Sequence, residues 1–256
     1  MSGTFHFKQF SVCNERSSMK VNTDGVLLGA AVTLRENDRN ILDAGTGTGV
    51  IALMLAQRMS VLLNAETAAA PCGGNDAVGI KITGIDIDGP SVQEAGENFS
   101  SSPWGHILEA RHVPLDAYVP DEPLDLIISN PPYFDSSLQA PEARRNAARH
   151  TLDDDMGLSY RTLAEYAAER LAPQGRLALV LPADRENDLR RFARSRGLFP
   201  FRILRIRTVP HRPPHRIIAE FIMTRCDCAE EELTIQEKGE YTSRYISLTK
   251  EFYIKF

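Results

Sequence analysis

Apolar runs of two lengths recur along most of the chain. Short runs bounded by turn residues predict buried strands, and longer segments with apolar residues every third or fourth position predict helices. The predicted strands cover residues 40–43, 80–86, 107–113, 124–129, 175–181, 201–209 and 216–223. The predicted helices cover residues 50–56, 156–171 and 185–196. Strands that alternate with helices form doubly wound, mostly parallel sheets, so we predict an α/β fold of that class.

The last two predicted strands are joined differently. The link between them is the proline-rich segment Pro210–His215, which is too short for a helical crossover. We therefore expect an antiparallel pair at the edge of the sheet.

Residues 60–79 break the pattern. They are rich in small residues and turn formers and have no sustained apolar period. We predict a surface loop that is inserted into the fold. The remaining length, in a chain of 256 residues that is 43% hydrophobic, suits one domain over residues 1–256. Residues 1–38 are expected to cover its functional site.

The first chemical motif is a glycine loop between the strand 40–43 and the helix 50–56. It contains Asp43, Gly45, Thr46, Gly47 and Gly49. The glycines fall at alternate positions, whereas dinucleotide-binding loops follow the spacing G-x-G-x-x-G. Alternate spacing after an acidic residue is typical of methyltransferases that use S-adenosylmethionine, and it predicts a site for that cofactor.

Two further acidic residues end the next predicted strands. Asp86 is the last residue of the second predicted strand. An acid at this position is expected to bond both ribose hydroxyls of the cofactor, and Ile87, which follows it, is expected to be a further cofactor contact. We interpret Asp88 as a helix cap. Asp116, with Ala117, follows the third strand and is expected to bond the adenine amino group. The alternative for Asp116 is an ordinary turn.

The second chemical motif is Asn130-Pro131-Pro132-Tyr133, directly after the strand 124–129. An amino group on a planar ring is a poor nucleophile, because its lone pair is delocalised. The side-chain carbonyl of Asn130 and the backbone carbonyl of Pro131 can accept its two N–H groups and aim the lone pair at a methyl group. Pro132 restricts the backbone, and Tyr133 offers a face for stacking. The alternative is a proline turn that ends a strand.

The charge is unevenly distributed. The formal net charge is −5, yet Arg185 to Arg216 contains ten arginines and two acids, for +8. A second basic cluster, Arg144, Arg145 and Arg149, follows the Asn-Pro-Pro-Tyr motif and is expected to bind phosphates of a nucleic acid substrate. The alternative for both groups of arginines is that they lie on solvated helix faces and pair with acids elsewhere.

Other classes of site receive little support. No apolar run approaches the ~20 residues that span a bilayer, and the first ten residues lack a signal-peptide core, so we expect a cytoplasmic protein. The four cysteines, Cys13, Cys72, Cys226 and Cys228, lack paired metal-ligand spacing and are expected to be free thiols. We predict no metal site, including at His211 and His215, and no obligate protein partner.

The chain resembles the bacterial tRNA(Val) adenine-N6-methyltransferases nearly from end to end. The resemblance rests on Phe7–Phe10, Met19–Gly29, Asp43–Gly49, Asn130–Tyr133 and Leu248–Tyr253. It implies a Rossmann-like class I methyltransferase fold, S-adenosylmethionine as cofactor, and the adenine beside the anticodon of a valine tRNA as substrate. It also implies that Lys20, Thr23 and Asp24 lie over the methionine end of the cofactor. For Asp24, the start of a helix is an equal alternative.

Other functions remain open at this point. Protein glutamine methyltransferases use the same Asn-Pro-Pro-Tyr motif on a side-chain amide. They typically carry a helical domain before the glycine loop, whereas 42 residues precede Asp43 here. A methyltransferase fold that binds without turnover, a nucleotide-dependent oxidoreductase and a DNA adenine methyltransferase are weaker alternatives. Asn130 argues against a fold that binds without turnover, and the alternate glycines argue against an oxidoreductase. For a DNA methyltransferase, no stretch of the chain is left over for a domain that reads DNA sequence.

Overall fold

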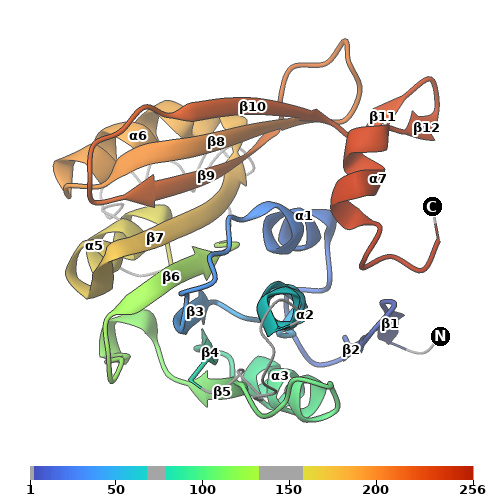
Figure 1. Ribbon diagram of the computed structural model, residues 1–256, viewed down its shortest axis with the longest axis vertical. Coiled ribbons are helices and arrows are strands. Elements are labelled where there is room, and N and C mark those ends of the chain that lie inside the picture. Colours follow the sequence, from blue (N-terminus) through green and yellow to red (C-terminus); the bar gives the residue numbers. More distant parts are fainter. Residues whose placement is uncertain (1–2, 68–78, 133–157, 256) are drawn as a thin grey trace, which may run out of the picture.

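A mixed β-sheet forms the centre of the protein (Figure 1). The computed structural model describes residues 3–67, 79–132 and 158–255. Within these residues eight strands form the sheet, in the order β10-β8-β9-β7-β6-β3-β4-β5. The strands are β3 (Asn40–Ala44), β4 (Lys81–Asp86), β5 (Leu108–His112), β6 (Leu124–Ser129), β7 (Leu171–Pro182), β8 (Phe199–Arg207), β9 (Arg216–Ile222) and β10 (Ala229–Thr234).

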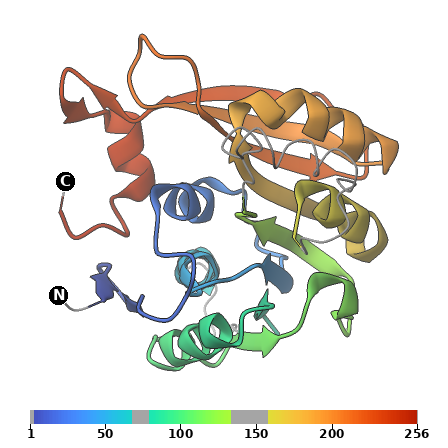
Figure 2. The same cartoon turned by 180° about the vertical axis from the view of Figure 1, so that it is seen from behind.

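Helices cover both faces of the sheet, as predicted for a doubly wound fold. One face carries α1 (Thr23–Ala31), α2 (Val50–Thr67) and α3 (Gly89–Ser100). The other carries α5 (Tyr160–Arg170) and α6 (Glu186–Ser195), seen in front of the sheet in Figure 2. Short 3-10 turns, η1 (Leu115–Ala117) and η2 (Ala183–Arg185), follow β5 and β7. Each face has its own apolar core.

The central strands contain consecutive apolar residues because they are buried on both faces. Leu126, Ile127 and Ile128 of β6 are all inaccessible to solvent, although neighbouring residues point to opposite faces. Parallel strands covered by helices on both faces have no solvated side. The sequence prediction of buried strands at these positions is confirmed.

The antiparallel pairing of β8 with β9 is also confirmed. However, β9 lies between β7 and β8 and is antiparallel to both, and the outermost strand on this side is β10, which the sequence analysis missed. The pair therefore lies at the antiparallel end of the sheet, with β10 as one further strand outside it. In β10 only Leu233 is buried, and three consecutive glutamates replace an apolar run. These glutamates form salt bridges with Arg202, Arg205 and Arg207 of β8, so the side chains of this part of β10 are joined to the sheet by ion pairs and not by apolar contacts.

The loop predicted for residues 60–79 is wrong over its first part. Helix α2 continues to Thr67, so residues 60–67 are helical. Met59 and Leu63 lie one helical turn apart and are buried in the core, whereas Val61 is 60% exposed. This short apolar face extends the helix beyond the stretch with obvious periodicity. Residues 68–78 lie outside the described part of the chain.

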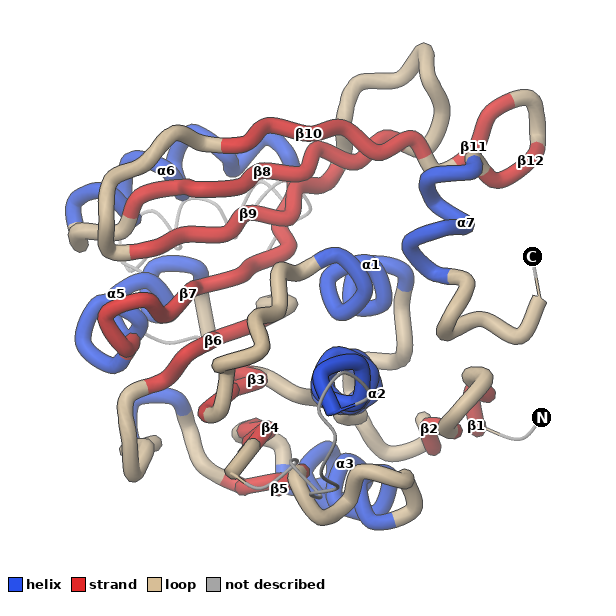
Figure 3. The backbone as a smooth tube through the Cα atoms, viewed as in Figure 1, coloured by secondary structure: helices blue, strands red, loops and turns tan. Residues whose placement is uncertain are grey.

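The two ends of the chain pack against each other. Strands β1 (Thr4–His6) and β2 (Ser11–Cys13) form an antiparallel hairpin beside the loop that follows α7 (Ser243–Thr249) (Figure 3). The backbone N–H of Lys8 donates to the carbonyl of Phe252 at 2.8 Å, and the rings of Phe7 and Tyr253 stack. A small hairpin of β11 (Gln236–Glu237) and β12 (Glu240–Tyr241) precedes α7. Two segments that carried the family resemblance are thus neighbours in space.

Candidate active site

The glycine loop connects β3 to α2 through residues 45–49. Gly45, Gly47 and Gly49 have positive φ angles of 72°, 54° and 80°, a conformation that side chains rarely adopt. The backbone N–H groups of Gly45 and Thr46 both donate to the carbonyl of Ile85 at 2.9 Å, which ties the loop to the end of β4. The backbone path itself therefore requires the alternate glycines.

Gly49 has a packing role in addition. A Cβ at this position would lie 2.4 Å from Cε1 of Phe99 on α3. Helix α2 can begin this close to α3 only because the residue has no side chain. Gly49 consequently does not line the cavity described next.

A cavity lies over the glycine loop at the carboxyl ends of the central strands. Its walls are Met19, Lys20, Asn22, Gly25, Gly45, Thr46, Gly47, Thr48, Val50, Ile51 and Asn130. The loop, the start of α1 and the segment before α1 thus meet the end of β6 at one place. Ligands of open α/β sheets bind at this edge. Five of the predicted site residues line the cavity: Lys20, Gly45, Thr46, Gly47 and Asn130.

Asn130 follows β6 directly and is 7% exposed. Its Nδ2 donates to Oδ1 of Asn22 at 3.4 Å and lies 3.9 Å from Sδ of Met19. The Nδ2 of Asn22 donates to the carbonyl of Lys20, which sets the orientation of that amide. Of the two residues that follow, Pro131 is buried and Pro132 is exposed. The side chain of Asn130 is therefore held at the wall of the cavity.

Asp86 ends β4 beside the glycine loop. Its Oδ2 accepts the N–H of Gly47 at 2.9 Å, and its Oδ1 accepts the N–H of Asp88 at 3.0 Å. The next side chain, Ile87, is 64% exposed. Asp116 and Ala117 lie in η1, exposed at the same edge of the sheet. Asp88 caps α3 by accepting the N–H of Ser91 at 3.0 Å, as expected from the sequence.

Asp43 lies beneath the loop and outside the cavity walls. It is inaccessible to solvent, its Oδ2 accepts the hydroxyl of Thr46 at 2.7 Å, and its Oδ1 is buried as well. Burial raises the pKa of Asp43 to about 7, although the bond from Thr46 acts in the opposite direction.

The raised pKa of Asp43 predicts a loss of stability as the pH rises. Between the unfolded pKa of 3.8 and the folded value of about 7, the folded state binds the proton more tightly. The free energy of unfolding should fall over this range, by roughly 4 kcal/mol in total if Asp43 acts alone. Urea unfolding of wild type and Asp43→Asn at a series of pH values measures the effect. Equal pH profiles for the two proteins would contradict it.

Comparison with known proteins identifies the family. Residues 30–208 match the RMKL-like methyltransferase domain family. A tRNA1(Val) (adenine(37)-N6)-methyltransferase of Bacteroides fragilis is 39% identical, over 98% of this chain and 98% of the relative. The chain belongs to this family. A relative of the same name from Vibrio vulnificus is 36% identical, over 98% of this chain and 95% of the relative.

Solved structures support the fold of this family member. A predicted O-methyltransferase from Agrobacterium tumefaciens has a TM-score of 0.61 at 16% identity, covering 90% of this chain and 96% of its own. The T. thermophilus 16S rRNA N2 methyltransferase RsmC, solved with AdoMet and guanosine, has a TM-score of 0.52 at 19% identity, covering 82% of this chain and 46% of its own. The class I methyltransferase fold predicted from the sequence is confirmed.

In this methyltransferase, the residues that the resemblance placed over the cofactor lie just before α1 and in its first turn. Lys20 lines the cavity, and its ammonium group donates to the carbonyls of Asn14 and Glu15, both at 2.8 Å. Thr23 begins α1 and is exposed, and Asp24 pairs with Arg216 of β9 at 2.7 Å. The ion pair connects α1 to the sheet beside the cavity.

Four predicted site residues, Tyr133, Arg144, Arg145 and Arg149, lie outside the described residues. Their contacts with a substrate stay predictions.

The basic stretch from Arg185 to Arg216 follows the alternative interpretation over most of its length. Arginines of α6 and β8 form salt bridges with glutamate and aspartate side chains, including Glu186, Glu230 and Asp188. Their charge is therefore largely neutralised within the fold. The arginines of this stretch therefore join α6, β8 and β10 to one another through ion pairs.

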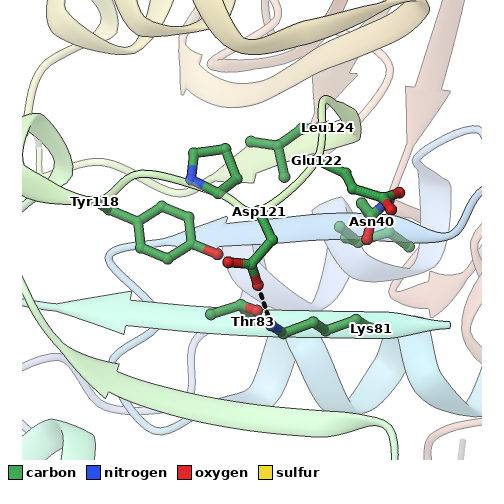
Figure 4. A pocket seen from close by; sticks show the side chains of 9 residues that line it. Asn40, Lys81, Thr83, Tyr118, Asp121, Glu122 and Leu124 are labelled. Atoms are coloured by element: carbon green, nitrogen blue, oxygen red, sulfur yellow. Dashed lines mark hydrogen bonds and ion pairs between the residues drawn. The ribbon is translucent and has the colours of Figure 1, made fainter. Parts of the chain in front are cut away.

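A second hollow lies at the opposite edge of the sheet. Figure 4 shows Tyr118, Asp121 and Lys81 around it, with Asp121 paired to Lys81 at 3.2 Å. Its walls also include Asn40 and Leu124, the first residues of β3 and β6. It therefore lies at the amino ends of the strands, away from the edge where sheets of this class bind ligands.

Some residues of the cavity walls were not predicted from the sequence. Met19, Asn22 and Gly25 lie within the segment that carried the family resemblance, but no chemical role marked them individually. Among the described residues, no group of three or more metal-ligand side chains comes together. Nor does any described helix have the length and apolar character to cross a membrane.

Proposed function

We propose that this protein transfers a methyl group from S-adenosylmethionine to the N6 amino group of adenine 37 in a valine tRNA. The observation that carries the proposal is the near full-length similarity to relatives of that name, with Asn130 at the wall of the glycine-loop cavity. The described site residues lie on or beside one eight-stranded sheet, so we propose a single methyltransferase domain. A tRNA substrate places the protein in the cytoplasm.

The described residues fit S-adenosylmethionine. A Cβ on Gly47 would lie 3.4 Å from Oγ of Ser17, so the glycine keeps open the space between the loop and the segment above it. Each carboxylate oxygen of Asp86 accepts one backbone N–H, and a carboxylate has about four acceptor sites, which leaves capacity for two ribose hydroxyls. The exposed side chain of Ile87 offers an apolar face for the adenine ring.

Asn130 and Pro131 would prepare the target nitrogen. S-adenosylmethionine supplies an electrophilic methyl group on a sulfonium. The Oδ1 of Asn130 and the carbonyl of Pro131 accept the two N–H groups of the adenine, which raises electron density on N6 and directs its lone pair. As the new N–C bond forms, the S–C bond breaks, and the nitrogen then loses one proton. The product is S-adenosylhomocysteine with N6-methyladenine.

The contact with Asn22 supports this orientation. Because Nδ2 of Asn130 donates to Asn22, the carbonyl end of the same amide is directed away from Asn22. A preorganised acceptor avoids the cost of turning the amide during the reaction. Tyr133 is proposed to stack on the target base, and Arg144, Arg145 and Arg149 to bind tRNA phosphates.

A labelling experiment tests the function. The protein is incubated with methyl-tritiated S-adenosylmethionine and, separately, with tRNA, DNA or protein extract from cells that lack this gene. We expect label as N6-methyladenosine in the tRNA sample alone, and mapping should place it at adenine 37 of a valine tRNA. Label in the protein sample would instead indicate a glutamine amide. Absence of label from all samples, despite measurable cofactor binding, would contradict the proposal.

Asp86→Ala should weaken cofactor binding before it affects the chemical step. Loss of hydrogen bonds from two hydroxyls to a charged acceptor should raise the Kd for S-adenosylmethionine by about 10- to 100-fold. Isothermal titration calorimetry measures this directly. The matched control is Asp88→Ala, which removes the α3 cap and about 1 kcal/mol of stability but should leave the Kd near that of wild type. Equal Kd values for Asp86→Ala and wild type would refute the assignment.

A further inference from the structure

The segment between β2 and α1 forms one wall of the cofactor cavity. We call residues 13–22 the strap. Met19, Lys20 and Asn22 of the strap line the cavity. The strap also passes directly over the glycine loop, since a Cβ on Gly47 would lie 3.4 Å from Oγ of Ser17 and 3.7 Å from the carbonyl oxygen of Met19. The position of the strap therefore sets the width of the cavity.

A polar face of α3 holds the strap in place. Asn98 accepts the N–H of Cys13 at 2.8 Å and donates to the carbonyls of Cys13 and Thr48 at 3.0 and 2.9 Å. Ser91 Oγ lies 3.0 Å from Ser17 Oγ. Ser91 and Asn98 are 1% and 4% exposed, so these polar side chains are buried against the strap.

Glu94 makes the central contacts. Its Oε1 accepts the N–H groups of Glu15 and Arg16 at 2.7 and 2.9 Å, and its Oε2 accepts the N–H of Ser17 at 2.9 Å. The side chain is inaccessible to solvent. Burial alone would raise the pKa of Glu94, but the backbone N–H donors outweigh it and the pKa lies below its ordinary value. The carboxylate is therefore charged when the strap is docked.

An amide cannot replace this carboxylate. The three donors approach both carboxylate oxygens, and a glutamine has only one acceptor oxygen. Its NH₂ group would face an N–H of the strap. One or more backbone N–H groups would lose their partner, and the strap would move away from α3.

We propose that Glu94 is a positioning residue for S-adenosylmethionine, acting through the strap. It sets the distance of Met19, Lys20 and Asn22 from the glycine loop without touching the cofactor itself. This inference rests on the proposed function for the identity of the ligand. It assigns to α3, a helix outside the cavity walls, control over cofactor affinity.

Glu94→Gln tests the proposal by separating affinity from turnover. The Kd for S-adenosylmethionine, measured by calorimetry, should rise about tenfold or more, and KM for the cofactor should follow it. The kcat at saturating cofactor should fall by no more than about threefold, because bound cofactor redocks the strap. The matched control is Glu97→Gln, which breaks the exposed contact of the same helix with Arg16 of the strap. Its Kd should stay within about twofold of wild type.

The fluorescence of Trp104 shows whether a variant is folded. This is the single tryptophan of the chain, and its ring lies 5.9 Å from that of Phe10 in the N-terminal hairpin. Unchanged emission and an intact thermal transition in Glu94→Gln show that the change is confined to the strap. Should this variant fail to fold, Ser91→Ala removes the weaker contact with Ser17 and should raise the Kd about two- to fivefold.

Each outcome bears on one proposal. If Glu94→Gln folds and has the wild-type Kd, the proposed role of Glu94 is wrong, even if tRNA is methylated. If Glu94→Gln does not fold, a wild-type Kd in Ser91→Ala likewise overturns the role of the contacts between α3 and the strap. If Glu94→Gln raises the Kd but the wild-type protein methylates no tRNA, the result supports the role of Glu94 and contradicts the proposed substrate. A similar rise in Kd for Glu97→Gln would show a general effect of α3 charge and overturn the specific role of Glu94.

Discussion

Asn130→Ala is expected to lower kcat by about a thousandfold or more, while the Kd for S-adenosylmethionine stays within a few-fold of wild type. The variant removes the acceptor that we propose directs the adenine amino group, and alanine offers no replacement. The glycine loop and Asp86, which are proposed to hold the cofactor, are unchanged. Single-turnover methylation of tRNA and calorimetry with S-adenosylmethionine give the two quantities.

The control for this variant is Asn40→Ala. Asn40 starts β3 at the opposite edge of the sheet, and its side-chain amide donates to Glu122 over a long distance of 3.4 Å. Its kcat should equal that of wild type. If Asn130→Ala instead lost cofactor binding with little change in kcat, Asn130 would be a cofactor ligand and its role in orienting the base would be wrong.

Asp38→Ala is expected to lower the free energy of unfolding by about 3–5 kcal/mol. Arg176 and Asp38 form an ion pair in which the side chains are 1% and 2% exposed, with contacts of 3.0 and 2.5 Å. Removing the carboxylate leaves the guanidinium buried. Among the described residues, its remaining acceptor is the carbonyl of Thr33, at 3.0 Å. Urea unfolding measures the difference.

A surface pair provides the matched control for Asp38. Asp188 contacts Arg191 at 2.6 Å, but the side chains are 42% and 80% exposed. Asp188→Ala should cost less than about 1 kcal/mol. The double variant of Asp38→Ala with Arg176→Met should recover much of the lost stability, because neither charge of this pair remains buried. Equal losses in the single and double variants would show that the unpaired charge is not the cause.

The central strands could be predicted from local sequence because their burial is uniform. β3, β4 and β6 are covered on both faces, so buried apolar residues can follow one another along the chain, as Leu126, Ile127 and Ile128 do. β10 could not be predicted in this way. Its glutamates pair with arginines 25 to 29 residues earlier in the chain, and a charged strand without its partner looks like a surface segment.

The site motifs were also predicted from local sequence, with one qualification. Gly45, Gly47 and Asn130 lie together at the cavity, and Asp86 contacts Gly47. Asp43 belongs to the same motif, yet it is buried beneath the loop and bonded to Thr46. A motif shows that an acid is required there but does not show which way its side chain points.

The sequence by itself determined the fold class, the glycine loop, the position of Asn130 after a buried strand and the family. These features depend on residues close together in the chain, where periodicity and turn chemistry are sufficient. Only the tertiary structure decided that Glu94 of α3 binds the strap, that β10 is the outermost strand of the sheet, and that Asp38 pairs with Arg176. Each of these joins segments that are distant in sequence, and hydrogen bonds and ion pairs between such segments leave no periodic signal in either one.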